Sequence, residues 1–183
     1  MRDRLIALLL ALITSVATLG SALPVHAQAA TREAGREAGR QEVGPETGLP
    51  IPRYVSLKTS RGRARRGPSM SHRVDWIFAR RDLPLRVTGE FEHWRRIEDS
   101  EGLGGWIHYS LLSGVRTVLV TEDMVPMRRT PAPEALEVAL LEANVVAHIM
   151  ECTIAWCRLS VDGARGWVER RALWGLDPDE VLD

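Results

Sequence analysis

Few residues in this chain could carry out covalent or metal chemistry. Its two cysteines, Cys152 and Cys157, flank four residues. The histidines beyond residue 27 are His72, His93, His108 and His148. No two of these histidines stand at helical spacing from each other, and two cysteines alone cannot complete the four-ligand shell of a structural zinc site. We therefore predict no metal site and no cofactor.

The serines and cysteines do not indicate an enzyme. The chain has no Gly-x-Ser-x-Gly elbow, and a Cys–His nucleophile would need a reactive thiolate, which a disulfide removes. The stretch 102–105, Gly-Leu-Gly-Gly, lacks the Lys and Ser/Thr that complete a phosphate-binding loop. We predict no catalytic residue, and a small enzyme with an unrecognised site is kept as one alternative function.

The cysteine pair fits a structural role. If residues 153–156 form a β-hairpin loop, Cys152 and Cys157 face each other across the strand pair, where the separation of Cβ atoms suits a disulfide. We predict that disulfide, and the alternative is a pair of free, partly buried thiols.

An internal repeat supplies the elements that would position these residues. The first copy contains Trp94-Arg95-Arg96-Ile97 and Gly105-Trp106-Ile107, and the second contains Trp156-Cys157-Arg158-Leu159 and Gly166-Trp167-Val168. A shift of 62 residues places Trp94 on Trp156 and, without a gap, Phe78 on Leu140. Anchors that recur in the same order predict two homologous β modules.

The strand pattern is clearest in the first copy. Apolar and polar residues alternate over 83–87, the period of a half-buried strand. Residues 133–144 contain strong helix formers, but they align with 74–82, where residues such as Trp76 favour a strand. We therefore predict a strand, followed by a turn at Asn144, because Asn tolerates a positive φ.

The tryptophans differ in whether they occur in both copies of the repeat. Residues that recur in both copies are predicted to form the core: Trp106, Trp167, Ile97 and Leu159. Trp94 and Trp156 also recur, at hairpin edges, where they either cover the core or line a binding groove. Trp76 and Trp174 do not recur, which favours a contact between modules or a ligand platform.

Charge separates the two copies. Residues 53–114 carry 12 Arg/Lys and 7 Asp/Glu, a net charge of +5, whereas residues 115–183 carry 7 and 12, a net charge of −5. The basic excess is either a solvated face, an attraction between the modules, or a patch for an anionic envelope partner. The residues predicted to bind a ligand all lie in the first copy: Arg65, Arg66, Trp76, Trp94 and Tyr109.

The N-terminal residues have the pattern of an export signal. Arg2 and Arg4 precede an apolar run over 5–19, and Val-His-Ala at 25–27 fits a cleavage site after Ala27. The apolar run is shorter than the roughly 20 residues of a membrane span. We predict a cleaved signal peptide and a periplasmic or secreted protein, which argues against a nucleic-acid partner; the alternative is an uncleaved N-terminal anchor.

The domain boundaries follow from composition and repeat. The signal peptide occupies 1–27. Residues 28–50 have no apolar face to bury and are predicted to be a disordered linker. The two modules cover 51–115 and 116–178, and residues 179–183 form an acidic tail.

Several short motifs resemble one known family. The first copy has Arg-x-Gly-Pro-Ser at 65–69, Trp-x-x-Ile at 94–97 and Gly-Trp-Ile at 105–107; the second has Arg128, Pro131, Trp156, Leu159, Gly166, Trp167, Val168 and a final Leu-Trp-Gly at 173–175. This pattern, over residues 51–176, resembles the tandem bacterial SH3-like (SH3b) domains of exported proteobacterial proteins. The second copy departs from it with Thr130 in place of Gly67.

The resemblance implies an all-β fold of two small SH3-like barrels, each of about five or six strands. Such modules bind cell-wall peptides, other proteins or metal-bearing partners. We therefore predict a non-enzymatic binding module for peptidoglycan or an envelope protein. The alternative is a structural scaffold that self-assembles through its tandem modules.

Overall fold

The computed structural model describes residues 42–183. The first module contains β1 (Arg53–Leu57), β2 (Gly62–Arg65), β3 (Val74–Phe78), β4 (Pro84–Phe91), β5 (Trp94–Glu98), β6 (Gly104–His108), the 3-10 helix η1 (Tyr109–Leu111) and β7 (Leu112–Ser113). The second contains β8 (Thr117–Val120), β9 (Val125–Arg128), β10 (Glu137–Leu141), β11 (Val146–Cys152), β12 (Trp156–Val161), β13 (Ala164–Glu169), the 3-10 helix η2 (Arg170–Ala172) and β14 (Leu173–Trp174). The predicted signal peptide, 1–27, lies outside the described residues.

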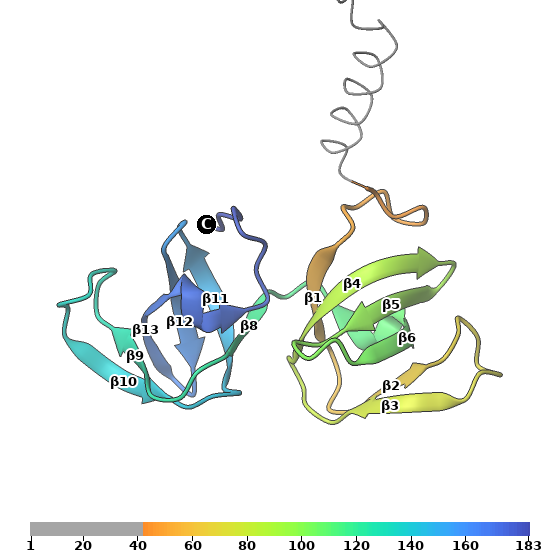
Figure 1. Ribbon diagram of the computed structural model, residues 1–183, viewed down its shortest axis with the longest axis horizontal. Helices are drawn as coiled ribbons and strands as arrows, with labels where there is room; N and C mark the ends of the chain where they lie inside the picture. The colour runs from red at the N-terminus through yellow and green to blue at the C-terminus, as the bar shows by residue number, and fades with distance from the viewer. Residues whose placement is uncertain (1–41) are drawn as a thin grey trace, which may run out of the picture. The chain divides into compact units, whose positions relative to one another are not determined.

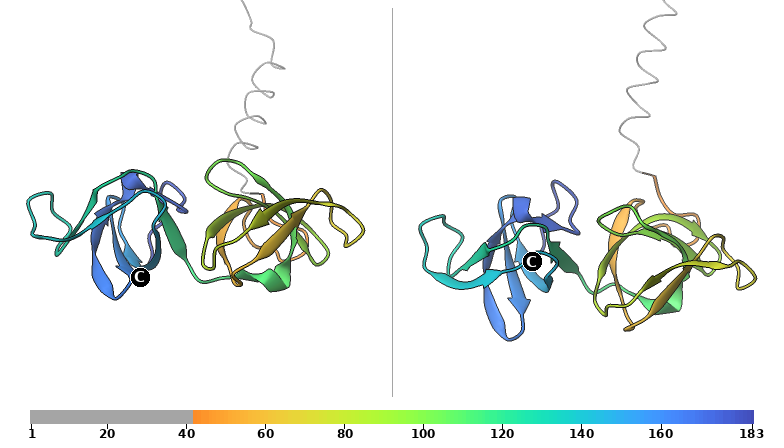
Figure 2. Two further views of the ribbon diagram at one scale, coloured as in Figure 1. Left: turned by 90° about the horizontal axis from the view of Figure 1, so that it is seen from below. Right: turned by 60° about the horizontal axis from the view of Figure 1, so that its bottom comes forward.

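Each module is one antiparallel sheet of seven strands, and the second repeats the first strand for strand (Figure 1). The order β3-β2-β6-β5-β4-β1-β7 corresponds to β10-β9-β13-β12-β11-β8-β14. Figure 2 shows that each sheet curls strongly on itself, so one small sheet can enclose a core. The predicted all-β fold in two tandem modules is confirmed.

Each module has its own hydrophobic core. Leu85 and Val87 on β4 are fully buried, whereas Arg86 between them reaches solvent, so the predicted alternation is confirmed over 85–87; it does not extend to Pro84, which is also buried. Ile97 and its counterpart Leu159 are 1% and 0% exposed and belong to the two cores, as predicted.

The prediction that Trp106 and Trp167 belong to the core is wrong. Both side chains are only half-buried, whereas the residues that follow them, Ile107 and Val168, are 0% exposed. Successive side chains of a strand point to opposite faces of the sheet, so both tryptophans lie on the outer face. They recur because that outer position is shared by the two modules.

The repeat register of the first hairpin also needs a correction. Gly62 on β2 pairs with Phe78 on β3, and the corresponding Val125 on β9 pairs with Leu141 on β10. Phe78 therefore corresponds to Leu141, not to Leu140, which is 48% exposed. The second copy is one residue shorter in the turn that follows.

That turn has the predicted conformation. Asn144 has a φ of 67°, and its counterpart Asp82 has a φ of 60°, both in the left-handed region that Asn and Asp tolerate. The segment 133–144 contains the strand β10, as predicted, despite its helix formers. Pairing with β9 outweighs the local propensity.

The predicted disordered linker, 28–50, is wrong for its last nine residues. Residues 42–50, called the strap below, form a loop closed by a β-bridge between Val43 and Pro50. The Gly44 N–H donates to the Leu49 carbonyl at 2.8 Å. The large apolar side chains of the strap, Val43 and Leu49, are exposed, and the strap is held by polar contacts with the first module. Residues 28–41 lie outside the described residues.

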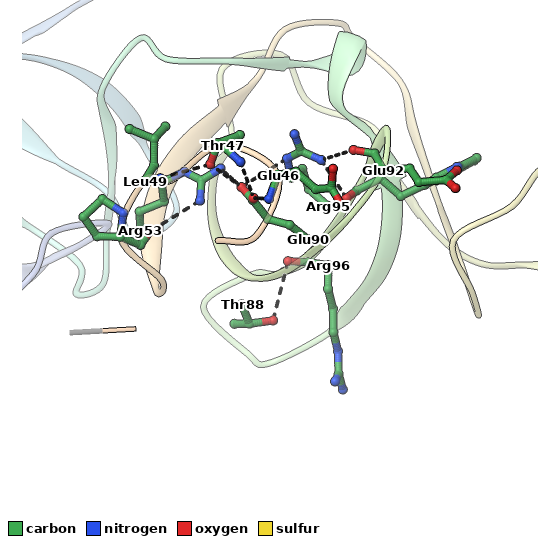
Figure 3. Close-up of polar contacts among 11 residues, drawn as sticks. Glu46, Thr47, Leu49, Arg53, Thr88, Glu90, Glu92, Arg95 and Arg96 are labelled. Carbon is green, nitrogen blue, oxygen red and sulfur yellow. Dashed lines mark hydrogen bonds and ion pairs between the residues drawn. The ribbon is translucent and has the colours of Figure 1, made fainter. Parts of the chain in front are cut away.

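Glu90, on β4, is the anchor of the strap (Figure 3). Its carboxylate is fully buried and accepts hydrogen bonds from the Thr47 N–H at 3.0 Å, the Thr47 hydroxyl at 2.7 Å and the Arg53 guanidinium at 2.6 Å. The Arg95 Nε atom lies 3.4 Å from the same carboxylate. Burial alone would raise the pKa of Glu90, but the hydrogen bonds from Thr47 and Arg53 outweigh it and hold that pKa below its ordinary value.

The predicted disulfide between Cys152 and Cys157 is present, and both residues are buried. The two cysteines are direct cross-strand partners on β11 and β12. The repeat places them on Glu90 and Arg95, which are direct partners on β4 and β5. The same position is therefore locked by an ion pair in the first module and by a disulfide in the second.

The predicted acidic tail, 179–183, packs on the second module. Leu182 forms a β-bridge with Cys152, and the Glu180 carboxylate accepts a hydrogen bond from Arg116 Nη2 at 2.8 Å. Burial alone would raise the pKa of Glu180, but Arg116 outweighs it and lowers that pKa. Each module thus has a terminal segment bound next to its cross-strand lock.

Two features are absent from the described residues. No helix in this part of the chain is long and apolar enough to cross a bilayer. Within residues 42–183 no group of three or more His, Cys, Asp or Glu side chains is placed to hold a metal ion. Neither finding concerns residues 1–41.

Candidate ligand groove

The first module has a groove of about 320 Å³, called the Trp94 groove below. It is lined by Arg61, Arg63, Arg65, Met70, Trp94, His108 and Leu111. These residues come from β2 and the loops on either side of it, from the start of β5, and from β6 with its 3-10 helix. Side chains far apart in the sequence are thus gathered at one place by the pairing of β2 with β6 and of β6 with β5.

The arginines reach the groove because of the alternation along β2. Ala64 is fully buried in the core, so Arg63 before it points outward. The β-bulge of this hairpin lies on β3, where Asp75 is the extra residue, so the alternation along β2 continues to Arg65. Arg63 and Arg65 on β2 and Arg61 directly before it therefore line one groove.

The floor of the groove is aromatic. Trp94 is 8% exposed and packs edge-to-face on the His108 ring, with ring centroids 5.7 Å apart. The His108 ring also lies 4.9 Å from the Tyr109 ring and 5.9 Å from the His93 ring. The His108 Nδ1 atom lies 2.8 Å from the Ser110 hydroxyl, which fixes the orientation of the imidazole.

The floor is supported from behind by the Glu90 network. The Arg95 guanidinium lies 5.9 Å from the centre of the Tyr109 ring, within the range of a cation–π contact. Arg95 also donates to the Trp94 carbonyl at 2.9 Å. The strap, Glu90, Arg95 and Tyr109 form a continuous series of contacts that ends beside the groove.

The groove is positively charged. Among the described residues, no carboxylate lies within ion-pair distance of Arg61, Arg63 or Arg65. Arg65 donates to the His72 carbonyl at 2.6 Å, which fixes its side chain without neutralising its charge. An aromatic floor beside such cations suits a ligand with an apolar group and a carboxylate or another anion.

The predicted ligand residues have separate locations. Trp94 and Arg65 line the groove, and Tyr109, 50% exposed, lies beside it. Arg66 instead forms an ion pair with Asp75 at 3.0 Å. Trp76 is 40% exposed on the edge strand β3, where it lines a different, shallow pocket.

Sequence reasoning missed five lining residues: Arg61, Arg63, Met70, His108 and Leu111. The arginines at every second position from 61 to 65 were the available signal, because that spacing places side chains on one face of a strand. No local pattern indicated His108, because its place in the groove depends on the pairing of β5 with β6.

The second module has a groove at the corresponding place. It has a volume of about 530 Å³ and is lined by Pro133, Ile154, Ala155, Trp156, Glu169, Arg170 and Arg171. Arg171 pairs there with Glu169, whereas Arg170 donates to the Thr153 carbonyl at 3.0 Å and has no carboxylate within ion-pair distance among the described residues. The two grooves thus share a tryptophan, but the first has three arginines without a carboxylate partner and the second has one.

Comparisons with solved structures give weak likenesses. NlpC2 from Trichomonas vaginalis matches at 14% identity and a TM-score of 0.32, covering 68% of this chain and 48% of that one. NlpC1 from the same organism matches at 14% identity and a TM-score of 0.32, covering 72% and 48%. The chain thus spans about half the length of these structures. No significant match was found among curated proteins.

Comparison with protein families gives one family that matches both modules. The model of the bacterial SH3 domain matches twice in tandem, at residues 58–114 and 121–175. These matches cover every strand of the two modules except the first of each, β1 and β8, and contain Trp94 and Trp156 in corresponding places. The chain belongs to the bacterial SH3 domain family and contains two copies of that domain.

Proposed function

We propose that this chain is an exported, non-enzymatic binding protein whose Trp94 groove binds a carboxylate-bearing peptide of the cell envelope, with the peptide of peptidoglycan as the first candidate. One observation carries the proposal: three arginines without a carboxylate partner among the described residues surround an aromatic floor. Arginine is well suited to bind carboxylates, because its planar guanidinium can donate two parallel hydrogen bonds.

The proposal has two further parts, export from the cytoplasm and a role without catalysis. The N-terminal pattern over 1–27 supports export to the periplasm or beyond, and the disulfide of the second module suits an oxidising compartment. Bacterial SH3 domains are typically binding modules, which supports a role without chemistry of its own. An envelope protein with an acidic segment is the other partner that fits this groove.

Co-sedimentation of the purified protein with peptidoglycan sacculi tests the proposal. Arg63→Glu should weaken binding about fivefold or more, the usual effect of removing an important interface side chain, and added salt should weaken the wild type. Arg165→Glu, an exposed charge reversal on β13, is the matched control and should bind like the wild type. Equal binding of all three proteins would refute the role of the groove.

The same experiment distinguishes peptidoglycan from an envelope protein as the partner. If the wild type does not sediment with sacculi even at low salt, peptidoglycan is excluded. Crosslinking in the envelope should then recover a protein whose capture is lost in the Arg63→Glu variant. If capture is the same in both proteins, the proposed groove is not the binding site for that protein either.

One observation favours self-assembly as a second candidate function. The edge strands β3 and β10 end their sheets and expose Trp76, Ile77 and Leu140, at 40%, 44% and 48%. Exposed apolar edge strands are templates for pairing with another chain. Light scattering should then show a mass that rises with concentration and falls in an Ile77→Lys variant, whereas a constant monomer mass would exclude this function.

A further inference from the structure

A second cleft of the first module, separate from the Trp94 groove, has no role in the proposed function. It has a volume of about 440 Å³ and is called the Trp106 cleft below. Its charged and aromatic lining comprises Arg65, Arg66, Asp75, Arg96, Glu98 and Trp106. Gly105 allows β6 to pass close to β2 there, because a Cβ atom at this position would lie 2.5 Å from the Arg65 carbonyl oxygen.

The two carboxylates of the cleft are already occupied. Asp75 accepts from Arg66 Nε at 3.0 Å through one oxygen and from Arg73 Nε at 2.5 Å through the other. The hydrogen bond from Arg66 is the main reason why the pKa of Asp75 is lowered. Glu98 accepts from Arg86 Nε at 2.6 Å. Neither carboxylate is therefore available to the other cations of the cleft.

Arg65, Trp106 and Arg96 form a row across three strands. Trp106 is the direct cross-strand partner of Arg65 on one side and of Arg96 on the other, so the three side chains share one face of the sheet. Among the described residues, no carboxylate pairs with either arginine of this row.

The second module contains the same row with one difference. Trp167 is the direct partner of Arg128 and of Arg158. Arg128 donates to the Ala135 carbonyl at 2.8 Å, just as Arg65 donates to the carbonyl of the corresponding His72.

The difference is a carboxylate. Glu137 is the cross-strand partner of Arg128 and forms an ion pair with it at 3.3 Å. The corresponding partner of Arg65 is Val74, which supplies no charge. The second module thus supplies a carboxylate to its arginine, whereas the first supplies none at the corresponding position.

We propose that the Trp106 cleft binds an external carboxylate or phosphate group, which takes the place that the Glu137 carboxylate occupies in the second module. Arg65 and Arg96 supply the positive charge, and Trp106 between them supplies an apolar surface for the adjoining part of the ligand. The site is on the outer face of the sheet and is distinct from the Trp94 groove, with which it shares Arg65.

An exchange of the distinguishing residue tests this proposal. The probes are inorganic phosphate and glutarate, titrated into the purified protein while NMR follows the Trp106 indole N–H and the Arg96 Nε–H. We expect saturable shifts in the wild type. Val74→Glu should weaken binding about fivefold, the upper value of an exposed ion pair, and Val74→Gln is the control that keeps size without charge. No saturable shift with either anion, or equal binding by Val74→Glu and Val74→Gln, would overturn the proposal.

The second module offers the reverse test. Glu137→Val should free Arg128, so that the Trp167 indole N–H responds to phosphate, whereas Glu134→Val, in the preceding loop, should leave it unresponsive. A silent Trp167 in the Glu137→Val variant would contradict the assignment of this position to an anion.

The source of the anion can be identified with the same pair of variants. Sacculi supply carboxylates, and vesicles containing phosphatidylglycerol supply phosphates. Both variants are made in an Arg63→Glu background, because an intact Trp94 groove would by itself retain Val74→Glu on sacculi. The surface that binds Val74→Glu about fivefold more weakly than Val74→Gln identifies the source, and equal retention of the two by both surfaces would count against the cleft. Arg63→Glu, which alters the Trp94 groove alone, separates a failure of this site from a failure of the proposed function.

Discussion

Replacing Glu90 by Gln should destabilise the first module strongly. The substitution keeps the shape of the side chain but removes the charge that Arg53 and Arg95 share. Their side chains are only 17% and 9% exposed, so water cannot fully replace the lost carboxylate. Removing one partner of a buried ion pair costs about 3–5 kcal/mol. Because Arg53 retains some contact with water, we expect a loss near the lower value, about 3 kcal/mol.

Urea denaturation followed by NMR measures this loss, because peaks from the two modules can be followed separately. Glu92→Gln is the matched control, since Glu92 is exposed in the turn after the same strand. Hydrogen exchange of the Thr47 amide, which donates to Glu90 at 3.0 Å, should accelerate in the Glu90→Gln variant and stay slow in the control. A free energy of unfolding that is equal in the two variants would refute the reasoning.

The same residue should make the first module sensitive to acid. The pKa of Glu90 is lowered in the folded state, because the hydrogen bonds from Thr47 and Arg53 outweigh the effect of burial. Its stabilisation is therefore fully present above the unfolded value of about 4.3 and is lost as the pH falls through the lower folded-state value. The wild type should lose stability below about pH 4, and the Glu90→Gln variant should have a flatter profile.

Three further changes have expected outcomes. Reducing the disulfide between Cys152 and Cys157 should cost the second module about 2 kcal/mol, from the short loop it closes, and leave the urea midpoint of the first module unchanged. Ile107→Ala should cost about 2–5 kcal/mol, and Trp106→Ala clearly less, since the tryptophan is half-buried; similar losses in urea denaturation would contradict the register. Asn144→Ala should reduce the free energy of unfolding of the second module by about 1 kcal/mol and lower its melting temperature. Asn144→Gly should not, because glycine adopts a positive φ without strain.

Much of the fold was predictable because its signals are local. The alternation along β4, the turn at Asn144 and the pairing of Cys152 with Cys157 each depend on residues close together in the chain. The strand β10 was predictable only through the repeat, because its own residues favour a helix. Its register was missed because both faces of this edge strand carry apolar residues, so that an alignment shifted by one looks equally good.

The rest of the site depends on contacts across the sheet. Recurrence identified Trp106 and Trp167, but recurrence cannot distinguish a core position from an outer row shared by both modules. The strap was missed because its anchor, Glu90, is 43 residues from Thr47 in the sequence. Charged residues such as Glu90 are rarely buried without a partner, and nothing in the local sequence shows that partners come from the strap.

The two cross-strand locks depend on different conditions. The ion pair of the first module forms wherever the chain folds at moderate pH, and it needs no other molecule. The disulfide of the second module needs an oxidant, and in a reducing compartment the two thiols stay reduced. In a chain that passes from a reducing to an oxidising compartment, the ion pair of the first module would therefore form before the disulfide of the second. The disulfide would then show that the chain had reached the oxidising compartment.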